Sequence, residues 1–350
     1  MWNRRGWCRF CASALIGSGL SVARAQVTPA PTVRTVAARL VVAVDNKTAF
    51  CYLPLTIAER LGYFKSEGLD VQIREFADPG QSVQAVIAGN AHMYSGSYSS
   101  TISLQARGQS FQSFVLQGRA PQIVLGVSQN TMRHYRQLRD LRGKKIGIMG
   151  HGSGSHRVAR LLLTRVKLSD QEVQYISLPT AEMAIEAFHL RQIDAICYTD
   201  PVITALEQGG ALRVVADTRT VRGNAEVFGG PMPAGSLIAS TEFIGSYPRL
   251  SQSMADAMVH ALKWLQTAGP SDIIKAVPES YFQDDRALYL AAFSRAREAW
   301  APDGVMPDKG PDTAARVLAQ FDNTDTLKRL QLERTFTNEF ALKAKAKYRA

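Results

Sequence analysis

The residues best suited to bind a small ligand lie in two short loops rich in serine and glycine. Gly152, Ser153 and Ser155 stand at the start of an apolar helical pattern, and Ser97 and Tyr98 precede another. Small residues let free backbone amides approach a ligand, hydroxyls add hydrogen bonds, and the positive end of a helix dipole favours an anion. The alternative is that Ser155 only caps its helix and the glycines form a tight turn.

Polar and charged side chains after other predicted strands supply further candidates. Asn46 and Lys47 follow the first strand, and Arg119 follows a strand near the predicted hinge. Lys47 and Arg119 are candidate counter-charges for an anion, with a solvated or structural ion-paired base as the alternative. Asp200 could accept hydrogen bonds from a ligand amine or hydroxyl, or it could cap the helix that starts at Pro201.

Aromatic residues fall in the same loops. Phe50, Tyr52, Tyr98 and Tyr198 could line an apolar pocket with polar edges. The alternative for each is an ordinary place in the core or on the surface.

Motifs for catalysis or metal binding are absent from the sequence. The six histidines are scattered, and His151 and His156 are not at the i, i+4 spacing of a helical metal pair. The glycine–serine loop lacks the Gly-Lys-Ser/Thr of a P-loop, and no G-x-S-x-G nucleophile motif is present. We therefore expect a protein that is not an enzyme and needs no cofactor or metal.

Strands alternate with amphipathic helices, and this order positions the candidate residues. Ile57 and Leu61 recur at helical spacing, whereas residues 71–76 alternate apolar and polar side chains as a strand does. Pro54 suits the first helical turn, and Gly62 suits the left-handed residue that ends a helix. The alternation predicts α/β units with parallel sheets, in which ligands bind at the carboxyl ends of the strands.

The order of the elements predicts two lobes. Two apolar segments, residues 122–127 and 236–240, could join them. Lobe one would comprise residues 39–127 and 239–350, and lobe two residues 128–238. A cleft between the lobes would bring together four candidate loops, residues 45–52, 95–98, 151–155 and 198–200.

Composition excludes several classes of protein. The chain has 350 residues and a hydrophobic fraction of 46%, which is typical of a globular protein with sizeable cores. Its net charge is +11. The lysines and arginines are scattered and no nucleic-acid-reading motif is present, so we expect no nucleic-acid partner. Cys51 and Cys197 are the only cysteines outside the first 25 residues, and we expect no disulfide between them because the predicted fold puts them in different lobes.

The N-terminus has the pattern of an export signal. Residues 1–25 combine three early arginines, a short apolar stretch and a small-x-small sequence at Ala23–Ala25. Arg4 and Arg5 leave open whether the twin-arginine or the general secretion route is used. The sequence predicts a signal peptide over residues 1–25, a flexible leader over residues 26–38 and a periplasmic protein.

Several phrases of the chain resemble one family. Residues 53–71, Leu-Pro-Leu-Thr-Ile-Ala-Glu-Arg-Leu-Gly-Tyr-Phe-Lys-Ser-Glu-Gly-Leu-Asp-Val, look like its opening helix and strand. Asp140–Lys145 looks like its D-L-(K/R)-G-K-K segment, Gly152-Ser153 like its glycine–serine pair, and Asp194 with Asp200-Pro201 like its V-D-A…(E/D)-P segment. The family is the periplasmic substrate-binding proteins of nitrate-, sulfonate- and taurine-type ABC importers, which share their fold with thiamine-pyrimidine synthesis proteins.

Two positions depart from the family pattern A-L-x-x-G-x-x-D. His92 stands where the aspartate is expected in lobe one, and Arg191 stands where the glycine is expected in lobe two. These departures leave the subfamily, and with it the ligand, undefined.

The resemblance implies a fold, a ligand class and partners. The expected fold is the α/β, two-lobed periplasmic-binding-protein fold of type II, in which each lobe is a mainly parallel sheet flanked by helices. The implied ligand is a small organic anion, such as a sulfonate, a taurine-like compound or an aromatic carboxylate. The implied partners are an ABC permease and its ATPase, and the implied state is a monomer. A receptor for a thiamine precursor, an enzyme on the same fold and a sensor coupled to a membrane kinase are the alternatives.

Overall fold

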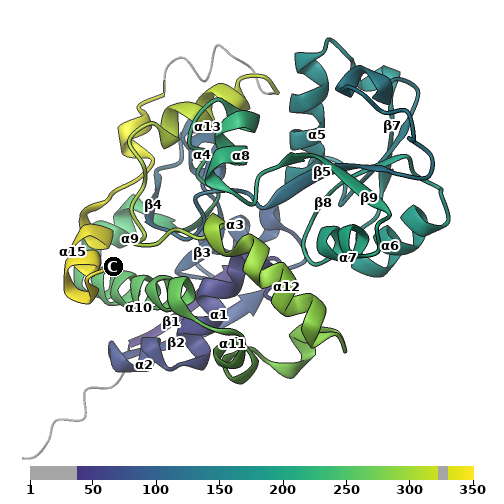
Figure 1. The fold of residues 1–350 in the computed structure, drawn as a ribbon. Coiled ribbons are helices and arrows are strands. Elements are labelled where there is room, and N and C mark those ends of the chain that lie inside the picture. The colour runs from purple at the N-terminus through teal and green to yellow at the C-terminus, as the bar shows by residue number, and fades with distance from the viewer. Residues whose placement is uncertain (1–37, 322–329) are drawn as a thin grey trace, which may run out of the picture. The chain divides into compact units, whose positions relative to one another are not determined.

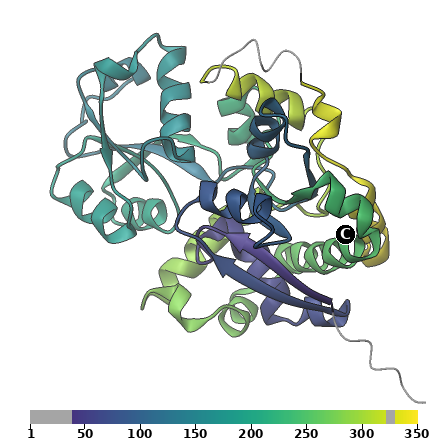
Figure 2. The same ribbon diagram turned by 180° about the vertical axis from the view of Figure 1, so that it is seen from behind.

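The computed structural model describes residues 38–321 and 330–350, which form two five-stranded sheets with flanking helices (Figures 1 and 2). The predicted signal peptide and most of the predicted leader lie outside the described residues. Each sheet is mainly parallel and contains one antiparallel strand, in agreement with the predicted fold class. We call the sheet that contains β1, together with the helices packed on it, the first lobe. The sheet that contains β5, together with its helices, is the second lobe.

The first sheet has the strand order β2-β1-β3-β10-β4. β1 pairs in parallel with β2 and β3, whereas β10 runs antiparallel to β3 and β4. The strands are β1 (Ala38–Val44), β2 (Leu69–Glu75), β3 (Met93–Ser97), β4 (Phe111–Leu116) and β10 (Gly235–Ser240).

Helices from both ends of the described chain belong to the first lobe. Before the second sheet come η1 (Phe50–Tyr52), α1 (Leu53–Arg60), α2 (Tyr63–Ser66), α3 (Pro79–Ile87) and α4 (Ser99–Ala106). After β10 come α9 (Thr241–Ser246), α10 (Pro248–Thr267), α11 (Pro270–Ala276), η4 (Glu279–Phe282), α12 (Arg286–Ala296), η5 (Arg297–Ala299), α13 (Gly310–Leu318), η6 (Leu332–Arg334) and α15 (Glu339–Tyr348).

The second sheet has the order β7-β6-β8-β5-β9, and β5 is its antiparallel strand. The strands are β5 (Ile123–Ser128), β6 (Lys145–Ile148), β7 (Gln174–Ser177), β8 (Ala195–Thr199) and β9 (Leu212–Asp217). The helices are η2 (Leu138–Leu141), α5 (Gly154–Arg165), η3 (Asp170–Glu172), α6 (Ala181–His189), α7 (Val202–Gln208) and α8 (Val221–Phe228).

The local signals read from the sequence are present in the structure. Pro54 lies in the first turn of α1, and Gly62 has φ +74° between α1 and α2, as predicted. β1 alternates its faces: Leu40 and Val42 join the cluster that contains α10, whereas Val41 joins the cluster beside α3 and α4. β1 is therefore an apolar strand covered by helices on both faces of its sheet.

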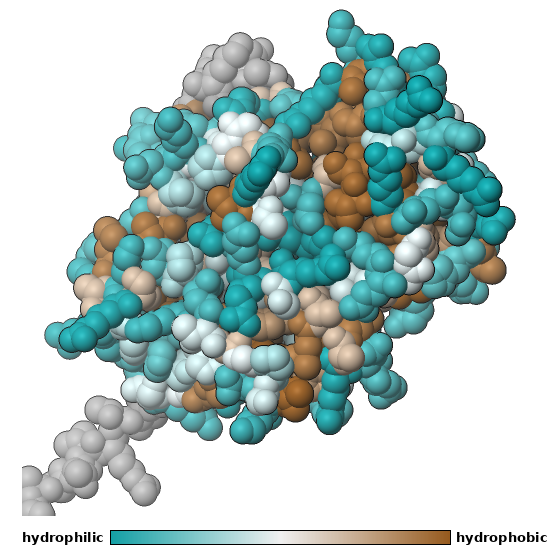
Figure 3. Space-filling view, in the orientation of Figure 1, coloured by the Kyte–Doolittle hydropathy of each residue, from teal (hydrophilic) through white to brown (hydrophobic). Residues whose placement is uncertain are grey.

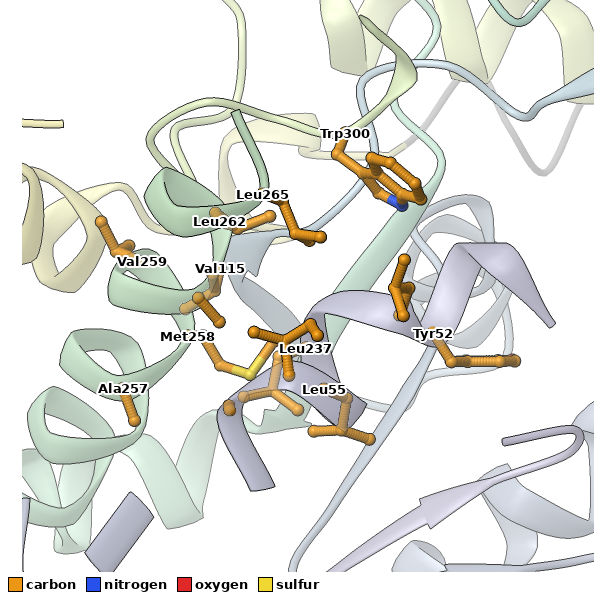
Figure 4. Packing of buried hydrophobic residues seen from close by; sticks show 14 of the residues in the cluster. Tyr52, Leu55, Val115, Leu237, Ala257, Met258, Val259, Leu262, Leu265 and Trp300 are labelled. Carbon is orange, nitrogen blue, oxygen red and sulfur yellow. The ribbon is translucent and has the colours of Figure 1, made fainter. Parts of the chain in front are cut away.

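The core of the first lobe is built around α10. Met258 of α10 lies beside Leu237 of β10 and near Leu55 of α1, and all three are fully buried (Figure 4). Trp300 is also fully buried, and its indole N–H donates to the carbonyl of Phe50 at 3.0 Å. α10 thus ties the first strands of the chain to the segments that follow the second lobe.

The strand pairing differs from the predicted division of the chain at both crossovers. Residues 122–127 were expected to leave lobe one, but β5 pairs along its length with β8 and β9 of the second sheet. Every side chain of β5 is buried, so its apolar pattern suits a central strand in either lobe, and only the pairing shows which. The returning segment is β10, which pairs along its length in the first sheet, so residues 235–238 belong to the first lobe and not to lobe two as predicted.

The surface is mixed in polarity. Figure 3 shows one face, on which hydrophilic residues predominate and hydrophobic residues gather mainly beside α5, near β5, β8 and β9. Within residues 38–321 and 330–350, no helix is long and apolar enough to cross a membrane.

Candidate functional site

A pocket of about 90 Å³ lies where the two lobes meet. Ser97 and Ser99 line it from the first lobe, at the end of β3 and the start of α4. Gly154 and Arg157 line it from the second lobe, in the first turns of α5. The carboxyl ends of β3 and β6 therefore meet there, as expected for a ligand site in open α/β sheets. Apolar residues complete the wall, among them Ile123, Val158, Phe228, Met232 and Leu318.

The start of α5 is organised by its own serines. The Ser153 hydroxyl caps the helix by accepting the N–H of His156 at 3.2 Å. The Ser155 hydroxyl is fully buried, accepts the N–H of Met149 at 3.0 Å and lies 2.9 Å from the Ser153 hydroxyl. Ser153, and not Ser155, is therefore the capping residue, and both hydroxyls are occupied within the loop.

The backbone amides of this loop are its free donors. Gly152 has φ +77°, a left-handed conformation that favours glycine. The N–H groups of Gly154 and Ser155 open the helix and have no acceptor among the described residues. Ser155 is fully buried, but Gly154 lines the pocket, so its N–H at the positive end of a twelve-residue helix can donate to an anion.

Arg157 is a candidate that the sequence reasoning missed. Its side chain is exposed, lines the pocket between the lobes and has no hydrogen-bond or ion-pair partner among the described residues. The charged residues predicted from the sequence directly follow strands, whereas Arg157 lies one turn into a helix. The sequence signal for Arg157 is its position three residues after Gly154, within the first turn of the helix that the glycine–serine loop opens.

Asn46 and Lys47 follow β1 but do not line this pocket. The Asn46 side chain accepts hydrogen bonds from the amide and hydroxyl of Thr48. The Lys47 ammonium lies 2.6 Å from the Glu59 carboxylate, and its backbone N–H donates to Glu75. The charge of Lys47 is thus compensated within the first lobe, and a binding role for either residue stays a prediction.

All four aromatic candidates are buried, and the Tyr198 hydroxyl donates to the Leu178 carbonyl at 2.9 Å. Phe50 belongs to the core of the first lobe and stacks on Tyr289 with ring centroids 4.8 Å apart. The Tyr52 hydroxyl donates to Asp45, and the Tyr98 hydroxyl lies 2.6 Å from that of Thr335. Burial raises the pKa of Tyr98 to about 12 and that of Tyr52 well above its usual range, so both phenols stay neutral. Their polar groups are used inside the protein.

We expect replacement of Phe50 by leucine to lower the free energy of unfolding by about 1 kcal/mol, because the aromatic pair with Tyr289 is lost. Ligand affinity should not change, since the ring packs in the core. Urea unfolding and a binding titration measure the two effects. Phe76→Leu is the control, because Phe76 is half-buried and makes no aromatic contact among residues 38–321 and 330–350. A selective loss of affinity in Phe50→Leu would instead support the predicted binding role.

Arg119 is held by the segment before Trp300. Its guanidinium Nε donates to the Glu298 carbonyl at 2.7 Å, and its backbone N–H donates to the Ala299 carbonyl. The amide of Asn224, from the second lobe, donates to the carbonyl of Arg119. Arg119 therefore joins the lobes at the crossover, and its role toward a ligand stays a prediction.

Asp200 is buried and faces an arginine. Its Oδ1 accepts the N–H of Thr204 at 2.9 Å and the Thr204 hydroxyl at 2.7 Å, so it binds the first turn of α7, although the N-cap of this helix is Pro201. Its Oδ2 lies 3.3 Å from the Arg219 guanidinium. Burial raises the pKa of Asp200, although Arg219 and the Thr204 hydrogen bonds act in the opposite direction.

Arg219 is the centre of a charge cluster that the sequence did not reveal. Its side chain is only 3% exposed and contacts Asp200, Glu207 and Asp217. Glu207 also accepts from Arg295 of α12 at 2.6 Å, so the cluster reaches from the second lobe to the first. Burial acts to lower the pKa of Arg219, but the three carboxylates outweigh it and the pKa is raised.

Two larger pockets, of about 850 Å³ and 390 Å³, each lie within one lobe, and neither is lined by a residue that the sequence predicts for the site. Within residues 38–321 and 330–350, no group of three or more histidine, cysteine, aspartate or glutamate side chains could hold a metal ion. Cys51 and Cys197 are free thiols, and burial raises the pKa of Cys51 to about 12.

Comparisons with known proteins identify the family and the fold of the chain. The sequence model of the NMT1/THI5-like family matches residues 50–267, more than half of the chain. No curated protein matches. A solved structure from Bordetella bronchiseptica RB50 is 42% identical, with a TM-score of 0.81, and the match covers 89% of this chain and 98% of that one.

Structures of lower identity share the fold. The periplasmic aliphatic sulphonate binding protein SsuA from Escherichia coli is 16% identical, with a TM-score of 0.68 over 87% of this chain and 99% of that one. The periplasmic nitrate-binding protein NrtA from Synechocystis PCC 6803 is 12% identical, with a TM-score of 0.63 over 90% and 89%. The resemblance read from the sequence is confirmed: the chain belongs to the NMT1/THI5-like family and has the two-lobed fold of periplasmic substrate-binding proteins.

Proposed function

We propose that the protein is an exported solute-binding receptor that holds a small organic anion between its lobes and delivers it to an ABC permease. The observation that carries the proposal is the pocket that is lined both by Arg157, an exposed cation with no partner among the described residues, and by Gly154, whose amide is free. Ser97 and Ser99 face them from the first lobe. An anion there would bring the two lobes together.

The pocket favours a ligand with a charged end and an apolar end. Arg157 and the serines supply the polar side, whereas Phe228, Met232 and similar residues supply the apolar side. A volume of about 90 Å³ is small beside the several hundred Å³ of drug-sized sites. Of the predicted classes, short sulfonates and taurine-like compounds fit this space better than aromatic carboxylates.

Export and transport complete the proposal. The SsuA and NrtA structures are described as periplasmic binding proteins, and the sequence of residues 1–25 has the pattern of a signal peptide. Closure of the lobes about the two crossovers would present the loaded form to a membrane permease. Turnover of the ligand is not part of the proposed function.

The test is a thermal-shift screen of the refolded mature protein, residues 26–350. The panel is ethanesulfonate, taurine, benzoate, nitrate and a thiamine-pyrimidine precursor, with chloride at equal ionic strength as the control. A ligand at about 100 times its Kd stabilises the native state by about 2.7 kcal/mol, a shift of several degrees. We expect a saturable shift from ethanesulfonate or taurine. A shift from the precursor alone would support the alternative receptor, and consumption of a compound would support an enzyme.

A further inference from the structure

His156 lies in the first turn of α5, next to the free amides. Its Nδ1 atom accepts the N–H of Gly152 at 2.9 Å, while its own backbone N–H donates to the Ser153 hydroxyl. His156 therefore closes the loop that precedes the helix: one hydrogen bond holds the helix cap, and the other holds the left-handed glycine.

The hydrogen bond fixes the charge state that the loop requires. An imidazole nitrogen that accepts an N–H carries no proton, so the neutral ring is protonated at Nε2. Protonation of the ring would place a hydrogen on Nδ1, facing the amide hydrogen of Gly152. The bond would then be replaced by a contact between two donors.

We propose that His156 is a positioning residue for the anion site: its neutral imidazole holds Gly152 and thereby aims the amide of Gly154 at the ligand. The proposal rests on the function proposed above. It predicts that the loop loosens, and that affinity for an anion falls, when His156 takes up a proton.

Titratable and charged groups from its own loop, from α5, from η3 and from β7 surround His156. His151 of the same loop lies 5.2 Å away and Tyr175 of β7 lies 4.6 Å away, between ring centroids. Arg157 and Arg160 of α5 and Asp170 of η3 are the charged neighbours. Partial burial lowers the pKa of His156, and His151, Arg160 and Arg157 act in the same direction, against Asp170. The switch therefore falls below pH 6.5, the usual value for histidine.

The sign of the pH effect separates positioning from simple charge attraction. A histidine that only adds positive charge near the ligand would bind an anion more tightly as the pH falls. A histidine that holds the loop would bind an anion more weakly as the pH falls. Ethanesulfonate is the probe, because its charge does not change between pH 5 and 8 and any pH dependence must come from the protein.

The experiment compares wild type with His156→Asn and His151→Asn by calorimetric titration from pH 5 to 8. Asparagine keeps an acceptor near the position of Nδ1 but does not titrate. We expect wild-type affinity to fall about fivefold to tenfold at the acid end, the cost of one hydrogen bond of about 1 kcal/mol. His156→Asn should keep the neutral-pH affinity and lose the pH dependence. His151→Asn should keep the acid loss, since the His151 side chain makes no hydrogen bond within residues 38–321 and 330–350.

A second readout does not need the ligand. The amide nitrogen and proton shifts of Gly152, followed by NMR in the free protein, should titrate with His156 in wild type and stay constant in His156→Asn. If ethanesulfonate fails to bind at every pH while Gly152 titrates, the positioning of the loop stands and the proposed ligand class is wrong. A Gly152 amide that ignores His156, or an affinity that rises toward acid pH, would overturn the proposal.

Discussion

Replacement of Arg219 by methionine is expected to lower the free energy of unfolding by about 3–5 kcal/mol at pH 7, the cost of breaking a buried ion pair from one side. Asp200, Glu207 and Asp217 would lose the cation that they share, and Asp200 is itself buried. The measurement is the midpoint and slope of urea unfolding.

The loss should shrink as the pH falls. Burial already raises the pKa of Asp200 in the folded protein, and removal of Arg219 raises it further. A carboxyl that binds its proton more tightly when folded lowers stability as the pH rises through its folded pKa. The difference between variant and wild type is therefore largest near neutral pH and smaller near pH 5.

Arg222→Met is the matched control. Arg222 lies three residues along the chain, its side chain is 90% exposed, and it pairs with Glu226 on the helix surface. Such a pair contributes about 0.3–0.5 kcal/mol. Equal losses in Arg219→Met and Arg222→Met, or a loss that grows toward acid pH, would contradict the role assigned to the buried cluster.

Replacement of Arg157 by glutamate should reduce affinity for an anionic ligand by about 100-fold, because a counter-charge becomes a like charge beside the pocket. The fold should survive, since Arg157 is exposed and pairs with no described residue. Calorimetric titration of ethanesulfonate measures the affinity, and thermal unfolding of the free protein checks the fold.

Arg222→Glu makes the same change of net charge on α8, away from the pocket between the lobes. Its affinity should stay close to that of wild type. If both variants lost affinity to the same extent, the effect would come from the field of the whole protein and not from a contact at the site.

Local chemistry explains what the sequence could predict. The periodicity of α1, the left-handed Gly62 and the glycine–serine start of α5 depend on neighbours in the chain, so their patterns are visible in the sequence. The order of strands and helices likewise predicts the parallel parts of both sheets. Ser97 and Gly154, the first residue of α5, line one pocket, as the rule for strand ends suggests, whereas the predicted Gly152, Ser153 and Ser155 do not line it.

Long-range packing explains the rest. Phe50 stacks on Tyr289 and the Tyr98 hydroxyl meets Thr335, so more than 200 residues of chain separate each pair. No local pattern tells whether such an aromatic residue faces a ligand or a partner in the core. The same holds for charged residues. Arg219 is buried among carboxylates, whereas the Arg157 side chain has no partner among the described residues, and nothing in the neighbouring sequence distinguishes the two arginines.

The most direct test is a crystal structure of the mature protein grown with the strongest-binding anion of the panel. We expect ligand density between Ser97 and Arg157, with the anionic group within hydrogen-bond distance of the Gly154 amide and with both lobes in contact with it. Density that touches one lobe only, or lies away from α5, would contradict the proposed site.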